Sequence, residues 1–422
     1  MATPSSTTRP LIVQKFGGMS LATPAHIKGA ARRVAELRAT GANVLAVVSA
    51  MGAATDGLIQ LAYSVSPHPN RRELDMLLST GERVSMSLFS MALSDALKEL
   101  VPESKAISFT GSQAGLLTDE THSNARIIDI KSIRVQEELT KGHVVILAGF
   151  QGVSPRTKEI TTLGRGGTDV TAVAMAAAFS ADRCEILKEV PGVMSADPRV
   201  VNEARVLPAL THLQLLNMTF WGAKVLHYRS VELAATHKVP LRVALAHDAK
   251  PSGMPSVTSD SDSGTDIRME TAMNSFENDR VLAVNSHADV RKLRVKTPDL
   301  QTALQKLKTR LLGNSLPLPQ ILHARQAGAM EVLITAPAES LEAQISCLKT
   351  DPSFEIDSRA YSTVTATCQG SYTTDLVVRF SESLASAKVE TLEVLQGPMS
   401  ITFLVEASAR EAGLKTLHGF TA

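Results

Sequence analysis

Short apolar runs alternate with longer stretches of helical periodicity over residues 11–245. The run at 11–14 precedes a glycine turn and then apolar positions at Ile27, Ala31, Val34 and Leu37, which share one face of a helix. The other strand-like runs are 43–49, 143–147, 183–190 and 239–244, and the other helical segments are 74–97, 172–179, 213–216 and 230–237. Strands that alternate with helices in this way predict an α/β fold, with a mostly parallel sheet sandwiched by helices.

The pattern changes at 247–279, where Ser, Asp, Pro and Gly are dense and apolar periodicity is absent. Beyond it, strand-like runs at 281–286, 330–337, 364–370 and 400–407 alternate with helical segments at 302–312, 341–349, 376–386 and 409–420. The first two runs and the last two predict a tandem pair of small α+β units, each of about 70 residues. We therefore predict a disordered start (1–10), a first domain (11–246), a linker (247–279) and a tandem region (280–422).

Composition narrows the range of partners. The 422 residues include 43 basic and 42 acidic side chains, a net charge of +1, and no basic tract of the kind that binds nucleic acid. The cysteines at 184, 347 and 368 form neither a metal-like pair nor an even disulfide framework, which fits a reducing cytosol. The start of the chain lacks the apolar core of a signal peptide, and no run approaches the roughly 20 apolar residues of a membrane span. We expect a cytoplasmic protein that acts on a small ligand, with no nucleic-acid or membrane partner.

The stretch at 161–172 (TTLGRGGTDVTA) is the strongest candidate for anion binding. Its glycines, at 164, 166 and 167, let the backbone approach a ligand, and the helix predicted from 170 offers unpaired N–H groups at its start. Arg165 adds a cation suited to a carboxylate or a phosphate. Two interpretations are open: an anion cradle, or a glycine-rich turn in which Thr168 or Asp169 caps the helix.

Further polar residues lie where predicted strands end. Lys15 ends the first strand just before Gly17 and Gly18, at the edge where parallel sheets bind ligands. It is either a point charge for phosphates or a surface lysine in a glycine turn. Ser49 ends the second strand and Thr55 opens the next segment, so their hydroxyls either orient a polar ligand or bond their own backbone.

Glu82 follows a glycine within an otherwise apolar helix. A glycine inside a helix costs about 1 kcal/mol relative to alanine, so Gly81 calls for a packing or ligand explanation. Glu82 is then either an acceptor for the amino group of a substrate or a solvated side chain on an exposed helix face.

Two turns, at 188–193 (KEVPGV) and 196–199 (ADPR), follow a predicted strand and offer backbone groups to a nucleotide base and ribose. Arg199 lies in the second turn and Lys224 lies beside a glycine, and each is otherwise a solvated cation. With Lys15 and Arg165, they supply the positive charge that phosphoryl transfer needs. The chain has no Walker, GxGxxG, HExxH or GxSxG motif, and the histidines at 227 and 247 lack metal-ligand spacing, so we read them as structural or surface residues and predict no protein metal site.

Eight motifs occur in order over residues 11–245: KFGG (15–18), SAMG (49–52), LSTGE (78–82), TGSQAG (110–115), GFQG (149–152), TTLGRGGTD (161–169), KEVPGVMSADPR (188–199) and GAKVLH (222–227). Together they resemble the aspartokinases of the amino-acid kinase superfamily. The resemblance implies the amino-acid kinase fold followed by ACT-like modules, which bind amino-acid effectors. It also implies phosphorylation of L-aspartate to 4-phospho-L-aspartate with ATP and Mg²⁺, the first step toward lysine, threonine and methionine.

The resemblance assigns roles to individual residues. It implies a catalytic set of Lys15, Arg165 and Asp169, with Asp169 as the organiser of the site. The implied aspartate-binding residues are Ser49, Thr55, Glu82, Arg165, Gly166, Gly167 and Thr168. The implied nucleotide-binding residues are Lys15, Gly17, Gly18, Lys188, Glu189, Met194, Arg199 and Lys224. The side-chain carboxylate of aspartate is ionised at neutral pH, so this chemistry requires no general base.

The chain departs from the family pattern on the nucleotide side. Met19 replaces the threonine of the usual KFGGTS, the usual TDVDGVYTADPR reads KEVPGVMSADPR, and Tyr228 replaces the proline of the common HPR. Two alternatives therefore stay open: a related kinase with another acid substrate, and a weakened kinase that acts as an amino-acid sensor. Because ACT-like modules commonly pair across chains, the resemblance also implies a homodimer or a larger homo-oligomer.

Overall fold

The computed structural model describes residues 9–246, 264–269, 281–297, 299–314, 316–327, 329–369, 371 and 373–421. Most of the predicted disordered start and most of the predicted linker lie outside these residues. The described chain divides into two compact units by its contacts. The first holds most of residues 9–272, and the second holds 273–421 together with two short segments, 195–205 and 220–223, that we had placed in the first domain.

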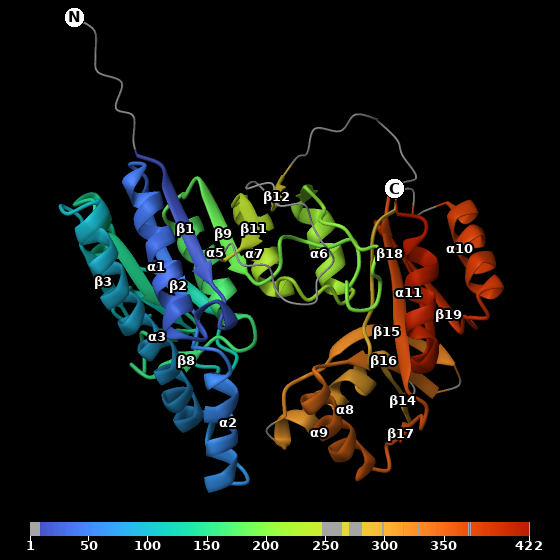
Figure 1. Cartoon of the computed structure of the whole chain (residues 1–422). Helices are drawn as coiled ribbons and strands as arrows, with labels where there is room; N and C mark the ends of the chain where they lie inside the picture. Colours follow the sequence, from blue (N-terminus) through green and yellow to red (C-terminus); the bar gives the residue numbers. More distant parts are fainter. Residues whose placement is uncertain are drawn as a thin grey trace, which may run out of the picture. The chain divides into compact units, whose positions relative to one another are not determined.

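The first unit is built on an eight-stranded sheet with the order β10-β12-β11-β9-β1-β2-β6-β3 (Figure 1). All neighbouring pairs are parallel except β11 and β12, which confirms the predicted mostly parallel sheet. β12 lies inside the predicted linker. The strands are β1 (Leu11–Phe16), β2 (Asn43–Val48), β3 (Ala106–Phe109), β6 (Val144–Ala148), β9 (Arg183–Lys188), β10 (Ala209–Thr211), β11 (Leu241–Leu245) and β12 (Thr265–Arg268).

Helices cover both faces of this sheet. Helices α1 (Pro24–Ala39) and α3 (Arg71–Leu100) pack on the face that carries Phe16, Ala46 and Val48, where the rings of Phe16 and Phe89 lie 5.3 Å apart. Because side chains alternate along a strand, the buried residues between these positions face the other side, where α5 (Gly167–Ala178) contacts β1, β2 and β9. The remaining helices of this unit are the short η1 (Met19–Leu21), α2 (Ala54–Val65), α4 (Ile133–Thr140), α6 (His212–Phe220) and α7 (Tyr228–His237), of which α7 packs on α5.

Local sequence explains where the two main helices of the first face begin. Thr23 is the N-cap of α1 and accepts a hydrogen bond from the N–H of His26 at 3.2 Å, with Pro24 in the first turn. Asn70 is the N-cap of α3 and accepts from the N–H of Arg72 at 2.9 Å. These caps satisfy N–H groups that a helix leaves unpaired at its start.

A second, smaller sheet in the first unit leads into the glycine-rich segment. Its order is β5-β4-β7-β8. The strands are β4 (Leu116–Thr118), β5 (Ile127–Ile130), β7 (Gln151–Val153) and β8 (Ile160–Thr162). Since β8 ends at Thr162, the glycine-rich segment connects this sheet to the first turn of α5.

The second unit contains two four-stranded sheets, β13-β18-β20-β19 and β15-β16-β14-β17. All pairs in both sheets are antiparallel, consistent with two ACT-like α+β modules. The strands are β13 (Val281–Asn285), β14 (Arg291–Val295), β15 (Gln320–Ala327), β16 (Ala329–Thr335), β17 (Phe354–Ile356), β18 (Tyr361–Cys368), β19 (Glu393–Gly397) and β20 (Ser400–Glu406). The helices are α8 (Leu300–Gly313), α9 (Ala338–Lys349), α10 (Thr374–Ser386), the short η2 (Ala407–Ala409) and α11 (Arg410–His418).

The chain order within this unit differs from the expectation of two units that follow one another. β13, which we had assigned to the first module, pairs with β18 of the second. The module formed by β14–β17, α8 and α9 is therefore inserted between β13 and the rest of the other module. The apolar pattern of 281–286 predicts a strand but carries no information about its partner, because pairing between distant strands is decided by tertiary packing.

No helix among the described residues is long and apolar enough to cross a membrane.

Candidate functional site

The site lies at the carboxyl edge of the main sheet. Lys15, the second-last residue of β1, is in register with Val47 of β2 and Ile186 of β9. Lys188 is the last residue of β9, and the first turn of α5 brings Asp169 to the same place. The sequence had predicted Lys15 at this edge, which is where open α/β sheets bind their ligands.

An ion-pair triad is the centre of this site. The ammonium of Lys15 lies 2.6 Å from Asp169 Oδ1, and that of Lys188 lies 3.6 Å from Oδ2. Burial opposes ionisation of Asp169, but the charges of the two lysines outweigh it and lower the pKa of Asp169 to about 2. Burial lowers the pKa of Lys188, while the charge of Asp169 opposes that effect. Lys188 also donates to the carbonyl of Val225.

The glycine-rich segment adopts a backbone that only glycine fits well. Gly164 and Gly166 have φ values of +75° and +72°, and a Cβ on Gly166 would lie 2.3 Å from the Cβ of His227. The N-cap of α5 is Gly166, so Thr168 and Asp169 lie inside the first helical turn rather than before it. The interpretation of Thr168 or Asp169 as an N-cap is therefore wrong. Arg165 is exposed, between two glycines of positive φ.

The turn after β1 is held against the turn after β2. The N–H of Gly52 donates to the carbonyl of Gly18 at 2.8 Å, and a Cβ on Gly18 would lie 2.9 Å from the carbonyl oxygen of Ala50. Glycine at 18 is thus required by this close approach. Ser49 is half-buried at the end of β2, and Thr55 lies in the first turn of α2.

Glu82 is buried, which excludes the interpretation of a solvated glutamate on an exposed helix face. Its Oε1 accepts from the N–H of Ala50 at 3.1 Å, and its buried Oε2 has no hydrogen-bond partner within the described part of the chain. Burial raises the pKa of Glu82 to about 7, against the hydrogen bond from Ala50 and the charge of Lys15. Packing explains the neighbouring Gly81, because a Cβ there would lie 2.9 Å from the Cβ of Ala50.

The other predicted nucleotide residues are less closely grouped. Glu189 is largely exposed and accepts from the hydroxyl of Ser20 at 2.7 Å, beside the turn after β1. Met194 is half-buried, and Lys224 is exposed on the segment before α7. Arg199 belongs to the second compact unit, where its guanidinium donates to both carboxylate oxygens of Asp197, at 2.9 and 2.7 Å. The first unit therefore joins Lys15, Lys188 and Asp169 directly, and not Lys224.

His227, which we had read from the sequence as a structural or surface residue, lies within the site. It packs against Gly166, and its Nδ1 accepts from the N–H of Arg229 at 3.3 Å as the N-cap of α7. Burial lowers the pKa of this imidazole. The position before a predicted helix was a signal for the capping role, but the contact with Gly166 joins residues 61 apart and had no signal in the sequence. His247 lies outside the described residues.

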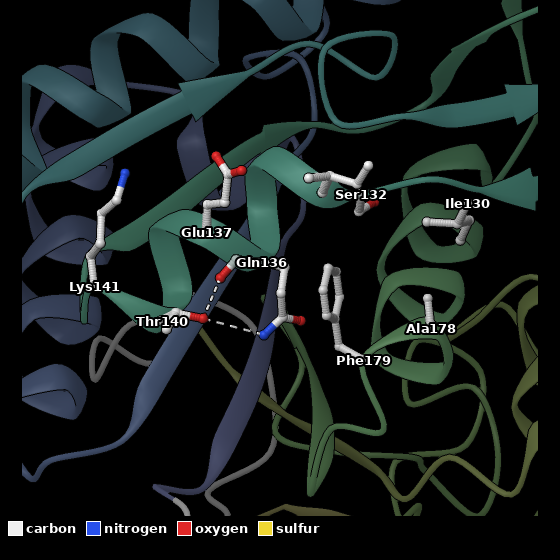
Figure 2. A pocket seen from close by; sticks show the side chains of 9 residues that line it. Ile130, Ser132, Gln136, Glu137, Thr140, Lys141, Ala178 and Phe179 are labelled. Atoms are coloured by element: carbon white, nitrogen blue, oxygen red, sulfur yellow. Dashed lines mark hydrogen bonds between the residues drawn. The ribbon is translucent and has the colours of Figure 1, made fainter.

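A separate surface depression of about 610 Å³ lies between α4 and the last residues of α5 (Figure 2). Its lining includes Ile133, Gln136 and Phe179, and Gln136 Nε2 donates to the hydroxyl of Thr140 at 3.5 Å. A helix of 12 residues such as α5 is about 18 Å long, so this depression lies at the opposite end of the helix from Asp169. None of the predicted site residues lines it.

The fold and the site define an α/β protein with two lysines and an aspartate clustered at the carboxyl edge of a mostly parallel sheet. The chain belongs to the amino acid kinase family, whose model matches residues 10–245. The aspartokinase of Mycobacterium tuberculosis is 50% identical over 241 residues, which cover 57% of this chain and 56% of that protein. Aspartokinase 2 of Bacillus subtilis is 49% identical over 233 residues, 55% of each chain. The chain thus matches little more than half the length of these relatives.

Solved structures extend the likeness beyond the first unit. Aspartokinase III of E. coli, in complex with aspartate and ADP, has a TM-score of 0.75 to this chain. The match covers 97% of this chain and 99% of the E. coli chain. At 19% sequence identity, this likeness shows a shared fold. The aspartate kinase of Synechocystis is 30% identical, with a TM-score of 0.52, and covers 97% of this chain and 69% of that one.

Proposed function

We propose that this protein phosphorylates the side-chain carboxylate of L-aspartate with ATP and forms 4-phospho-L-aspartate. The observation that carries the proposal is the triad of Lys15, Asp169 and Lys188, set beside a glycine-rich segment that presents Arg165. The identity of about 50% to aspartokinases over residues of the first unit supports aspartate as the acceptor.

The triad would bind the transferred phosphate. Asp169 holds the two ammonium groups at the carboxyl edge of β1 and β9, so their charge is in place before the nucleotide arrives. Gly17 and Gly18 allow the phosphates to approach the turn after β1. We propose that Lys188, Glu189, Met194 and Lys224 complete the nucleotide site.

The acceptor would bind on the other side of the triad. We propose that Arg165 pairs with a carboxylate of aspartate, since a guanidinium matches carboxylate geometry in two hydrogen bonds. Glu82, whose Oε2 has no hydrogen-bond partner in the described structure, would accept a hydrogen bond from the ammonium of the substrate. Ser49, Thr55, Gly166, Gly167 and Thr168 would complete this side of the site.

The reaction then needs position and charge rather than proton removal. The aspartate side chain is ionised at neutral pH, and one of its oxygens attacks the γ-phosphorus as the bond from that phosphorus to the ADP oxygen breaks. The negative charge that develops on the leaving oxygen and on the equatorial oxygens is stabilised by Lys15 and Lys188. Holding the two reactants in contact supplies much of the remaining rate enhancement.

We propose Mg²⁺ as the metal, bound mainly through phosphate oxygens and water, as it commonly is in kinases. Among the described residues, no group of three or more His, Cys, Asp or Glu side chains is arranged to hold a metal. Asp169 is already paired with two lysines, which fits a metal that arrives with the nucleotide. When bound, Mg²⁺ supplies further neutralisation of the phosphate charge.

An acyl-phosphate assay tests the proposal. The protein is given Mg-ATP and a panel of amino acids, ADP release is measured, and hydroxylamine traps any acyl phosphate as a hydroxamate. We expect hydroxamate with L-aspartate and not with L-glutamate. Turnover with another acid alone would establish the related-kinase alternative. Binding of an amino acid by the second unit without turnover would establish the sensor alternative, which the departures at Met19 and 188–191 motivate.

We further propose that the two ACT-like modules bind an amino-acid effector and that the protein is a cytoplasmic homodimer or larger homo-oligomer. The support is the pair of antiparallel α+β modules in the second unit. Addition of lysine or threonine to the assay tests the first point, and light scattering during gel filtration tests the second. A monomer at micromolar concentration would contradict the oligomer.

A further inference from the structure

A fully buried carboxylate on α3, that of Asp75, takes no part in the proposed chemistry. Its Oδ1 accepts from the hydroxyl of Thr162 at 2.6 Å, and its Oδ2 accepts from the N–H of Thr162 at 3.1 Å. Both oxygens lie 3.0 Å from the N–H of Ser123, and Oδ2 lies 2.8 Å from Nδ1 of His122. One carboxylate thus binds two chain segments that are 39 residues apart.

The two segments that Asp75 binds also bind each other and run directly into the glycine-rich segment. The N–H of Ala125 donates to the carbonyl of Thr162 at 2.9 Å. Ser123 has a φ of +65°, and its carbonyl oxygen lies so close to Gly164 that a Cβ there would come within 2.9 Å of it. A shift of residues 121–125 would therefore move the glycine-rich segment as well.

A second attachment holds the same segments from α7. The guanidinium of Arg229 donates to the carbonyl of Leu163 at 2.8 Å and to that of Ala125 at 2.6 Å. The residues just before Arg165 are therefore hydrogen-bonded both to a carboxylate on α3 and to a guanidinium on α7. These attachments precede Arg165 in the chain, and neither contacts its side chain directly.

We propose that Asp75 is a positioning residue that sets where Arg165 meets the acceptor carboxylate. The same helix carries Glu82 seven residues further on, about 10 Å along its axis. One rigid element thereby sets both the position of Glu82 and that of the Arg165 segment, and so the distance between the two groups that would bind the ends of the acceptor. The inference rests on the proposed function, because it assigns Arg165 to the acceptor.

The first test does not depend on activity. Hydrogen exchange is compared in the wild type, Asp75→Asn, Asp75→Ala and the control Glu185→Gln. Glu185 is also a buried carboxylate of the first unit, bonded to Gln14 Nε2 at 2.7 Å, on the sheet face away from Lys15. We expect the N–H groups of Ser123 and Thr162 to exchange at least about tenfold faster in both Asp75 variants, while β6 keeps its protection. Equal acceleration in β6 would show general destabilisation and overturn the inference.

The second test separates the two substrates. For Asp75→Asn we expect the KM for the acceptor to rise on the order of tenfold or more, with the KM for ATP within about twofold of the wild type. Glu185→Gln should change neither. A rise in both KM values, or a loss of kcat alone, would contradict a positioning role toward the acceptor. If the wild type shows no kinase activity, the proposed function fails, while the exchange experiment still decides whether Asp75 holds the segment.

Discussion

Asp169 on the first turn of α5 and Glu82 in the middle of α3 are both buried carboxyl groups of one site, yet their pKa values move in opposite directions. Both are about as little exposed, at 5% and 3%. Asp169 has two lysines within ion-pair distance, and its pKa falls to about 2. Glu82 accepts a hydrogen bond from one backbone N–H, that of Ala50, and burial raises its pKa to about 7. Burial alone is therefore no guide to charge, because the neighbours decide which form a buried acid adopts.

The largest expected effect comes from removal of one lysine from the triad. Lys15→Met leaves the buried Asp169 with Lys188 alone, so we expect a loss of about 3–5 kcal/mol in unfolding free energy and on the order of 10³ in kcat. Urea unfolding and the hydroxamate assay measure the two. Lys15→Met with Asp169→Asn leaves the ammonium of Lys188 without its carboxylate partner, so it should recover neither the stability nor the activity. A single variant as stable as the wild type would show that the ion pair is not what ionises Asp169.

The second effect concerns Glu82 and has the opposite sign to that of Asp169. Its folded pKa of about 7 lies above the ordinary value of 4.5, so the folded state holds the proton more tightly. The protonated carboxyl therefore stabilises the folded state fully below about pH 4.5. This contribution to the unfolding free energy, about 3 kcal/mol in total, is lost as the pH rises to about 7. Urea unfolding of Glu82→Gln should lack this loss. In the wild type, kcat/KM for the acceptor should rise over the same upper range, as Glu82 becomes the anion that binds an ammonium.

For Asp169 the dependence of stability on pH has the opposite sign to that for Glu82. Its folded pKa of about 2 lies below the ordinary value of 3.8, so its stabilising contribution is complete above about pH 3.8. That contribution, about 2 kcal/mol, is lost as the pH falls to about 2. Acid unfolding of Asp169→Asn should therefore depend less on pH in this window than that of the wild type. Parallel acid transitions of the two proteins would show that Asp169 is protonated at its ordinary pKa.

Glycine substitutions compare the same two regions through packing. In Gly166→Ala the alanine would have to adopt a left-handed backbone, and its Cβ would lie 2.3 Å from the Cβ of His227. We therefore expect a loss of about 1–2 kcal/mol in unfolding free energy and a weaker acceptor affinity. Gly81→Ala meets Ala50 at 2.9 Å but gains helix propensity, so its loss of stability should be smaller. Gly57→Ala in α2 meets nothing within 4 Å and is the control. Thermal unfolding gives the order, and a loss of stability in Gly81→Ala as large as that in Gly166→Ala would contradict the prediction.

The smallest effect is expected at Met19, where the chain departs from the usual KFGGTS. Its side chain is 57% exposed, so Met19→Thr should change the stability by less than about 0.5 kcal/mol. A hydroxyl restored beside the phosphate turn should raise kcat, measured in the hydroxamate assay with Met19→Ala as the control. An unchanged kcat would show that methionine at this position does not impair the reaction.

The first unit shows how far local pattern extends. The runs at 43–49 and 143–147 are continuous and apolar, as strands covered on both faces must be, and they became the neighbours β2 and β6. The glycines at 164 and 166 were predicted to allow a special backbone, and both have positive φ. The short strands β4, β5, β7 and β8 were missed because three or four residues carry too little periodicity to be recognised.

The sequence by itself determined the mostly parallel sheet, the lysine at its carboxyl edge and the glycine-rich segment before α5, since each follows from local periodicity or from a conformation that only glycine adopts. Only the tertiary structure decided that Lys188 joins Lys15 at Asp169, that Glu82 is buried and that Asp75 binds Thr162. It also decided that β13 belongs to the later module. These are contacts between residues far apart in the chain. The sequence around a charged residue or a strand does not indicate which distant residue or strand it will contact.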